Sequence, residues 1–189
     1  MNIDLNKICG SVASTANHVG HQIGQYVDAH ASGGLLSFFA TGNVVCLVAK
    51  WTGKALQIVQ SSQGYLVPDG LGIEGPQAFN THWTVINEGN NIVRLHNNNN
   101  YLCINAAQIM VIPSPSGVPS GSETKLRVSQ IGNAHVTLES VKEPGNFVAI
   151  SQTGAPAPGT GDSVAKQFTP RLLHSPYGAT HVRPHVYRI

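Results

Sequence analysis

Short segments in which apolar and polar residues alternate recur along the chain from Lys54 onward. Three of them, residues 56–58, 93–95 and 136–138, read apolar, polar, apolar, which is typical of half-buried β-strands. Their first residues are 37 and 43 positions apart. The pattern therefore predicts one structural unit that occurs three times.

Further strand signals follow inside each unit. A polar turn and a second strand led by an aromatic residue come next, at Tyr65, Tyr101 and Phe147. A last strand begins at Trp83, Leu126 and Phe168, and a strand between these two is plain at residues 71–73 and 109–112. Three units are too few for a propeller, and Asn-rich loops do not suit helical repeats. We therefore predict an all-β fold, a β-trefoil of three four-stranded repeats, over residues 55–173.

In such an arrangement, the apolar positions of the first strands and the leading aromatic residues should fill a shared core. The predicted core residues are Leu56, Ile58, Tyr65, Trp83, Val93, Leu95, Tyr101, Leu126, Val136, Leu138, Phe147 and Phe168.

The flanks differ from the repeats, and we expect them to be separate segments. Residues 6–30 carry apolar residues at helical spacing, so residues 1–54 are predicted to be an N-terminal extension made of an amphipathic helix plus an extra strand at residues 42–50. The extension could dock on the trefoil or mediate homodimerisation. Residues 174–189 are predicted to be a C-terminal tail. The most apolar stretch, residues 35–49, is shorter than the roughly twenty residues that span a bilayer, so no transmembrane span is expected.

Charge and cysteine content narrow the classes of function. Only 11% of residues are charged, the net charge is +2, and the eleven Lys and Arg residues are scattered singly, which argues against nucleic acid as a partner. Cys9, Cys46 and Cys103 are odd in number and widely spaced, so we expect thiols rather than a disulfide framework. Residues 1–8 lack the basic-then-apolar order of a secretory signal.

No residues group in a way that predicts chemistry. The nine Asp and Glu residues are spread singly, and no Gly-x-Ser-x-Gly turn occurs, so we expect no enzyme, no catalytic residue and no cofactor. Two histidine pairs, His18 with His21 and His181 with His185, lack a Cys or carboxylate neighbour. A metal site is therefore not expected.

Binding is instead predicted in two polar turns, because trefoil loops carry contact surfaces and both segments are rich in turn formers. The candidate binding residues are Gln60, Ser61, Ser62 and Gln63 in one turn, and Asn97, Asn98, Asn99 and Asn100 in the other.

Residues 138–149 resemble the closing signature of interleukin-1 family cytokines, which runs aromatic-x-Ser-small-x-x-Pro-x-x-aromatic-apolar-small. This chain has Ser140, Pro144 and Phe147 at the matching positions, and Leu138 where the family usually has Phe. Residues 123–140 with 168–172 also resemble the last third of fibroblast growth factors, although Thr124 replaces a signature Cys and residues 152–164 lack the basic residues that hold heparin.

The Tyr-Leu pairs at residues 65–66 and 101–102 are similar to those of fascin-type trefoils, which bundle actin. Neither Trp51 nor Trp83 has Gln two residues earlier, unlike ricin-type lectins. These resemblances imply a non-enzymatic, cytokine-like or growth-factor-like trefoil that acts on a protein receptor and is secreted without a visible signal peptide. The alternative is a cytoplasmic or surface-acting module that binds carbohydrate or actin. Localisation would separate the two.

Overall fold

The structure is a computed structural model that describes residues 34–116, 121–157, 159–160 and 163–177. The helix predicted over residues 6–30 and the tail beyond residue 177 lie outside the described residues. Within them, the helices are three short 3-10 turns, η2 (Leu35–Phe39), η3 (Phe79–Thr81) and η4 (Ser122–Thr124). None of these is long and apolar enough to cross a membrane.

The described residues are otherwise built from antiparallel strands. In chain order they are β1 (Val44–Ala49), β2 (Ala55–Gln60), β3 (Leu66–Gly72), β4 (Trp83–Gly89), β5 (Ile92–Asn97), β6 (Asn100–Asn105), β7 (Gln108–Pro113), β8 (Leu126–Ile131), β9 (His135–Ser140) and β10 (Phe168–His174).

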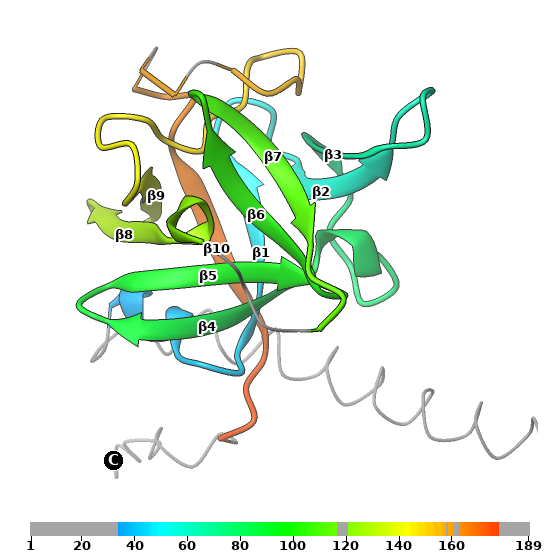
Figure 1. Cartoon of the computed structure of the whole chain (residues 1–189). Helices are drawn as coiled ribbons and strands as arrows, with labels where there is room; N and C mark the ends of the chain where they lie inside the picture. The colour runs from blue at the N-terminus through cyan, green and yellow to red at the C-terminus, as the bar shows by residue number, and fades with distance from the viewer. Residues whose placement is uncertain (1–33, 117–120, 158, 161–162, 178–189) are drawn as a thin grey trace, which may run out of the picture.

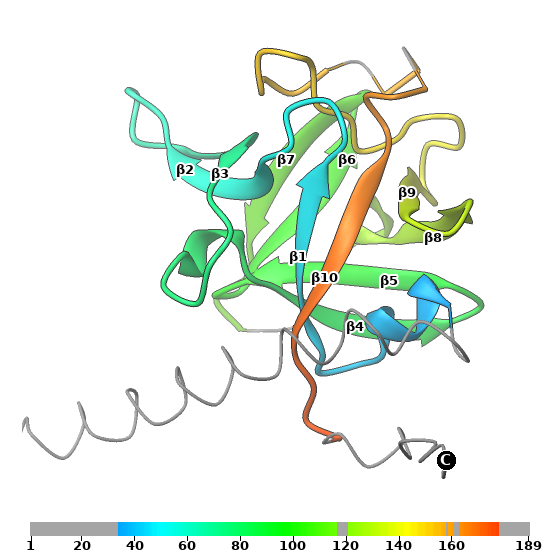
Figure 2. The same cartoon turned by 180° about the vertical axis from the view of Figure 1, so that it is seen from behind.

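Six of the strands close into a barrel. β1 pairs with both β10 and β4, β5 pairs with both β4 and β8, and β9 pairs with both β8 and β10. The crossing of β1 and β10 with β4 and β5 is visible from both sides (Figures 1 and 2). Closure gives every barrel strand a partner on both sides, so no backbone edge of the barrel is left open.

The chain forms three structural repeats, and in two of them a hairpin extends from the barrel. The first repeat runs from β1 to β4 and carries the β2–β3 hairpin, and the second runs from β5 to β8 and carries β6–β7. The third, from β9 to β10, has only the isolated bridges Glu139–Phe147 and Ile150–Pro156 in place of a regular hairpin. Equivalent core positions are Val45, Val93 and Val136; Leu47, Leu95 and Leu138; and Trp83, Leu126 and Phe168.

Matching these positions shows that the first repeat begins earlier in the chain than the sequence pattern predicted. The segment at residues 56–58 is a second strand, equivalent to β6, and not a first strand like β5 and β9. The true first strand is β1, which the sequence analysis placed in the N-terminal extension as an additional strand. It pairs along its whole length with β10, so the barrel requires residues before position 55.

The segment before β1 also belongs to the core. In η2, Leu35, Phe38 and Phe39 are buried, and the turn packs against β4, β8 and β10. The Leu35 backbone N–H donates to Gln130 Oε1 at 3.1 Å, and the Asn43 side-chain amide donates to the Phe38 carbonyl at 3.1 Å. The most apolar stretch of the sequence is therefore a buried turn followed by a buried strand.

Ten of the twelve predicted core residues are buried, and two are not. Tyr65 has 69% of its surface exposed, because it ends the β2–β3 turn and is not equivalent to the buried Tyr101 at the start of β6. Phe147 is half-buried, with Lys166 Nζ 4.8 Å from the centre of its ring. The residues at 65–67 and 71–73, predicted as two strands, are mostly one strand, β3.

Candidate functional site

The first predicted loop, Gln60 to Gln63, forms the tip of the β2–β3 hairpin and projects from the barrel (Figure 1). Its backbone closes on itself: the Ser61 N–H donates to the Tyr65 carbonyl at 2.8 Å and the Gly64 N–H donates to the Ser61 carbonyl at 2.9 Å. Ser62 and Gln63 are exposed. This loop is therefore a stable, accessible tip.

The second predicted loop, Asn97 to Asn100, is a tight turn between β5 and β6. Asn98 and Asn99 have φ angles of 47° and 61°, the left-handed conformation that Asn tolerates. The Asn100 side-chain amide donates to the carbonyls of Asn97 and Asn98, both at 3.1 Å. These contacts make the turn, so they account for the asparagine run without a ligand.

The 3-10 turn η3 connects the asparagine turn to strand β2. The Asn97 side-chain amide donates to the carbonyls of Phe79 at 2.5 Å and His82 at 2.9 Å. On its other side, the Asn80 amide donates to Gln57 Oε1 of β2 at 2.9 Å. The structure therefore brings the asparagine turn and the β2–β3 hairpin to one surface, with η3 between them.

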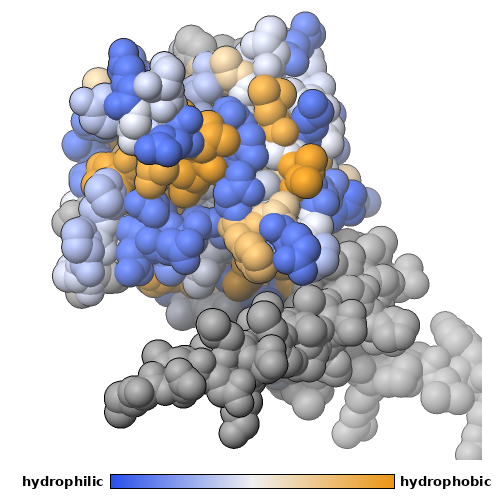
Figure 3. Space-filling model, turned by 90° about the vertical axis from the view of Figure 1, so that its right-hand side faces the viewer, coloured by the Kyte–Doolittle hydropathy of each residue, from blue (hydrophilic) through white to orange (hydrophobic). Residues whose placement is uncertain are grey.

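Exposed apolar side chains gather on this part of the molecule. Figure 3 views the side that carries the β2–β3 hairpin, where apolar residues form patches among polar ones. Ile73 is 74% exposed and Phe79 is 58% exposed. We call the set the first-repeat face, and it consists of Tyr65, Val67, Leu71, Ile73 and Phe79.

Sequence reasoning missed this face, although a signal for it exists. In β3, Pro68, Gly70 and Gly72 alternate with Val67, Asp69 and Leu71. The residues that turn inward are therefore small or cyclic, and the larger apolar side chains turn outward. A strand whose small residues share one face indicates that its apolar residues face away from the core.

The outer edge of β3 is protected against pairing with another strand. Pro68 has no N–H, the Leu71 N–H donates to Asp69 Oδ1 at 2.9 Å, and the Gly70 N–H donates to the Gly154 carbonyl at 2.8 Å. Blocked donors of this kind prevent edge-to-edge association. A partner at the first-repeat face would therefore contact side chains and not pair with the backbone of β3.

The second repeat shows which residue the fold accepts at the position equivalent to Phe79. In η3, the His82 N–H donates to the Phe79 carbonyl, and in η4 the Lys125 N–H donates to the Ser122 carbonyl. Phe79 and Ser122 thus hold equivalent backbone positions, and each 3-10 turn ends in a buried Thr, Thr81 or Thr124. Because the second repeat forms the same turn with a serine, the backbone does not require an aromatic residue there.

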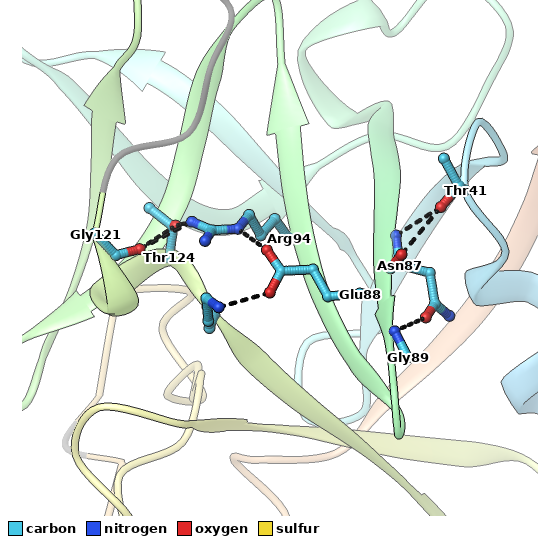
Figure 4. A network of polar contacts seen from close by, with 8 residues as sticks. Thr41, Asn87, Glu88, Gly89, Arg94, Gly121 and Thr124 are labelled. Atoms are coloured by element: carbon cyan, nitrogen blue, oxygen red, sulfur yellow. Dashed lines mark hydrogen bonds and ion pairs between the residues drawn. The ribbon is translucent and has the colours of Figure 1, made fainter.

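The most conspicuous charged cluster lies elsewhere and holds strands together. Arg94 of β5 is buried; its Nε lies 2.5 Å from Glu88 Oε1, and its Nη1 donates to the Gly121 carbonyl and to Thr124 Oγ1 (Figure 4). Lys125 Nζ lies 2.7 Å from Glu88 Oε2. Hydrogen bonds from Lys125 and then from Arg94 hold the pKa of Glu88 below its usual range. Every charge of the cluster is paired, which suits a structural role.

The cytokine-like signature also has a structural explanation. The Glu143 N–H donates to Ser140 Oγ at 3.0 Å, and the Gly145 N–H donates to Glu139 Oε1 at 2.9 Å. The two carboxylate oxygens of Glu143 accept hydrogen bonds from Ala106 and Ala107, each at 2.9 Å. The motif therefore builds a turn and ties it to the β6–β7 hairpin.

Neither described cysteine has the character of a nucleophile. Burial raises the pKa of Cys46 to about 12 and that of Cys103 to about 11, so both thiols are protonated at neutral pH. Across the described residues, no three His, Cys, Asp or Glu side chains are placed to hold a metal ion. Cys9, His18, His21, His181 and His185 lie outside those residues.

Comparison with known proteins bears on the fold. No model of a known protein family matches the chain, and no curated protein sequence matches it. Among solved structures, the designed threefold-symmetric protein ThreeFoil is similar, with a TM-score of 0.53 and 20% sequence identity; the match covers 70% of this chain and 99% of ThreeFoil. The chain has the β-trefoil fold. At this level of sequence identity the likeness extends to the fold alone.

Proposed function

We propose that this β-trefoil is a non-enzymatic binding protein that contacts a protein receptor through the first-repeat face. The observation that supports this proposal is Phe79, an exposed aromatic residue at a backbone position where the second repeat has Ser122. Exposed aromatic and aliphatic side chains on one surface are typical of protein interfaces, in which aromatic residues are enriched at the core.

The polar groups near this face favour a protein over a glycan as the partner. A sugar site needs several polar groups that converge on the ligand. Here the amides of Asn97 and Asn100 are engaged with backbone carbonyls, and Asp69 accepts from Gln57 Nε2 at 2.8 Å. The side chains that remain exposed on the first-repeat face are mainly apolar. Their burial against a protein would provide the driving force for binding.

Site-directed photo-cross-linking tests the proposal. The full chain carrying p-benzoylphenylalanine in place of Tyr65 is added to cell-surface extracts, and the same substitution at Ile131 is the control. Ile131 is also an exposed apolar residue, at 43%, but it lies at the end of β8 in the second repeat. We expect one cross-linked receptor band from position 65 and none from position 131.

Competition with unlabelled variants identifies the contact residues. Phe79→Ser, which copies the second repeat, and Ile73→Ser should each compete about tenfold less well than the unsubstituted chain, the effect of removing one interface hot spot. Ile131→Ser should compete normally. All three should melt as the parent does, because the substituted side chains are exposed.

A glycan array and an F-actin co-sedimentation assay accompany the cross-linking. Binding to a glycan or to actin that Phe79→Ser leaves unchanged, with no position-65 cross-link, would contradict the proposal and support the carbohydrate-binding or actin-binding alternative.

A further inference from the structure

We propose that acidification releases η3 from the asparagine turn and thereby regulates the first-repeat face, with His96 as the group that senses pH. The inference rests on the proposed function for its biological meaning. Its physical basis is the set of contacts around His96 and Asn97, and it can be tested without any partner.

The contacts that would be released are the two hydrogen bonds from the Asn97 side chain to the η3 segment. The Asn97 side-chain amide donates both of its hydrogen bonds across to the η3 segment, to the carbonyls of Phe79 and His82. The His82 ring lies edge-on to Phe79 with ring centres 5.6 Å apart, and its Nε2 lies 3.0 Å from the Gly75 carbonyl. The position of Phe79 therefore depends on the turn that holds Asn97 in place.

His96 directly precedes Asn97 in the chain. It sits on β5 opposite Thr84 of β4 and Tyr101 of β6, with its ring centre 5.0 Å from the Tyr101 ring. Its Nδ1 atom is buried, and no hydrogen bond reaches it from the described residues. Protonation makes both ring nitrogens donors and adds a charge. A buried charge without a partner is unfavourable, so the closed turn favours the neutral ring.

The neighbouring elements supply no compensating carboxylate. The titratable and charged groups around it are Tyr101 and Cys103 of β6, Arg94 of β5, His82 after η3, and Glu88 of β4. Glu88 is already paired with Arg94 and Lys125. Asp69 of β3, at the far side of η3, is bonded to Gln57. Burial accordingly lowers the pKa of His96.

The direction of the pH effect follows from this lowering. Above the ordinary histidine pKa of about 6.5, neither the closed nor the opened turn binds the proton. As the pH falls below that value, an opened turn with a hydrated ring binds it first, so opening becomes more favourable until the pKa of the closed turn is reached. The opening equilibrium rises about tenfold for each unit by which the closed-state pKa is lowered.

Hydrogen exchange of the full chain at pH 7.0 and 5.0, corrected for intrinsic exchange rates, measures this opening. The backbone N–H groups of Thr81 and His82 close η3. We expect their protection to be lower at pH 5.0 than at pH 7.0. The barrel amides of β8 and β10 should keep theirs. Equal loss in η3 and the barrel would indicate global unfolding and overturn the proposal.

Histidine variants identify the sensor. His96→Gln, which cannot be protonated, should make the exchange of η3 independent of pH. His174→Gln, at an exposed position at the end of β10, should respond as the parent does. An unchanged pH response in His96→Gln would overturn the assignment. If that variant fails to fold, NMR titration of His96 in the parent decides, and a pKa of 6.5 or above contradicts the proposal.

The two proposals can fail separately. Absence of the position-65 cross-link would contradict the receptor proposal but would not affect the hydrogen-exchange result. If the hydrogen exchange of η3 did not depend on pH, the pH proposal would fail and the receptor proposal would be unaffected.

Discussion

Three two-residue turns of this trefoil place both residues in the left-handed region of backbone space. Two of them use asparagine pairs, Asn90–Asn91 and Asn98–Asn99, which suit such angles. The third uses Ala106 and Ala107, with φ angles of 50° and 59°. Alanine is strained there, and the Glu143 carboxylate offsets part of that strain by binding both turn amides.

Ala107→Gly should therefore stabilise the protein by about 1 kcal/mol, because glycine removes the left-handed penalty at a smaller cost in unfolded-chain entropy. Ala134→Gly is the matched control: Ala134 is an exposed turn residue without a positive φ, and glycine there should destabilise by about 0.5 kcal/mol. Urea denaturation measures both. Destabilisation by Ala107→Gly would contradict the strain at this turn.

At the scale of elements, polar clusters connect strands that apolar packing alone would leave free to shift. The Arg94 cluster joins β4, β5 and η4 (Figure 4). The bonds of Asn87, to Thr41 Oγ1 at 2.8 Å and to the Phe39 carbonyl at 2.7 Å, hold η2 and the following turn against β4. Such contacts fix how the elements sit on one another because each donor has one favourable position.

Glu88→Gln should destabilise the protein by about 1–2 kcal/mol at pH 7, since it removes the counter-charge of the buried Arg94 from a pair whose carboxylate is partly exposed to water. The pKa of Glu88 is lowered in the folded state, so its stabilisation is present above the unfolded pKa and is lost as the pH falls through the folded pKa. Urea titrations at pH 7 and pH 2.5 test this: the difference between parent and variant should shrink in acid. An equal difference at both pH values would exclude the ion pair as its cause.

At the scale of the whole molecule, closure of the barrel joins the beginning of the described chain to its end. β1 pairs with β10, and η2 also packs on β10. Removing β1 would leave β4 and β10 each without one of its two partner strands and would delete Val45 and Leu47 from the core. Each buried aliphatic side chain contributes about 1.5–3 kcal/mol, against a total stability of about 5–15 kcal/mol for a domain.

A fragment of residues 34–177 should therefore fold, and a fragment of residues 55–173 should not, although the repeat pattern in the sequence suggested the shorter boundary. Dispersion of amide resonances in NMR spectra distinguishes the two states. Native-like dispersion in the 55–173 fragment would mean that β1 is dispensable and that the first repeat can close without it.

The sequence by itself determined the local features of this protein. The alternation around Val93, Leu95, Val136 and Leu138 identified real strands and their inward faces, because alternation is a property of each strand alone. The recurring strand signals indicated three repeats, although the 37-residue interval joined strands that are not equivalent, and the asparagine run indicated a tight turn. Low charge and solitary acidic residues favoured a binding protein over an enzyme, which stays a prediction.

Tertiary structure alone decided which strands close the barrel and what faces outward. β1 became a barrel strand because it pairs with β10 at the other end of the chain, and no local pattern encodes that pairing. Tyr65 and Tyr101 look alike in sequence, but only Tyr101 meets the core. The position of η3 likewise depends on tertiary contacts, because its residues bond to Gln57 of β2 and to Asn97 of the asparagine turn. Long-range pairing fixes the exposed face of a hairpin, since either face of a strand can be buried until its partners are in place.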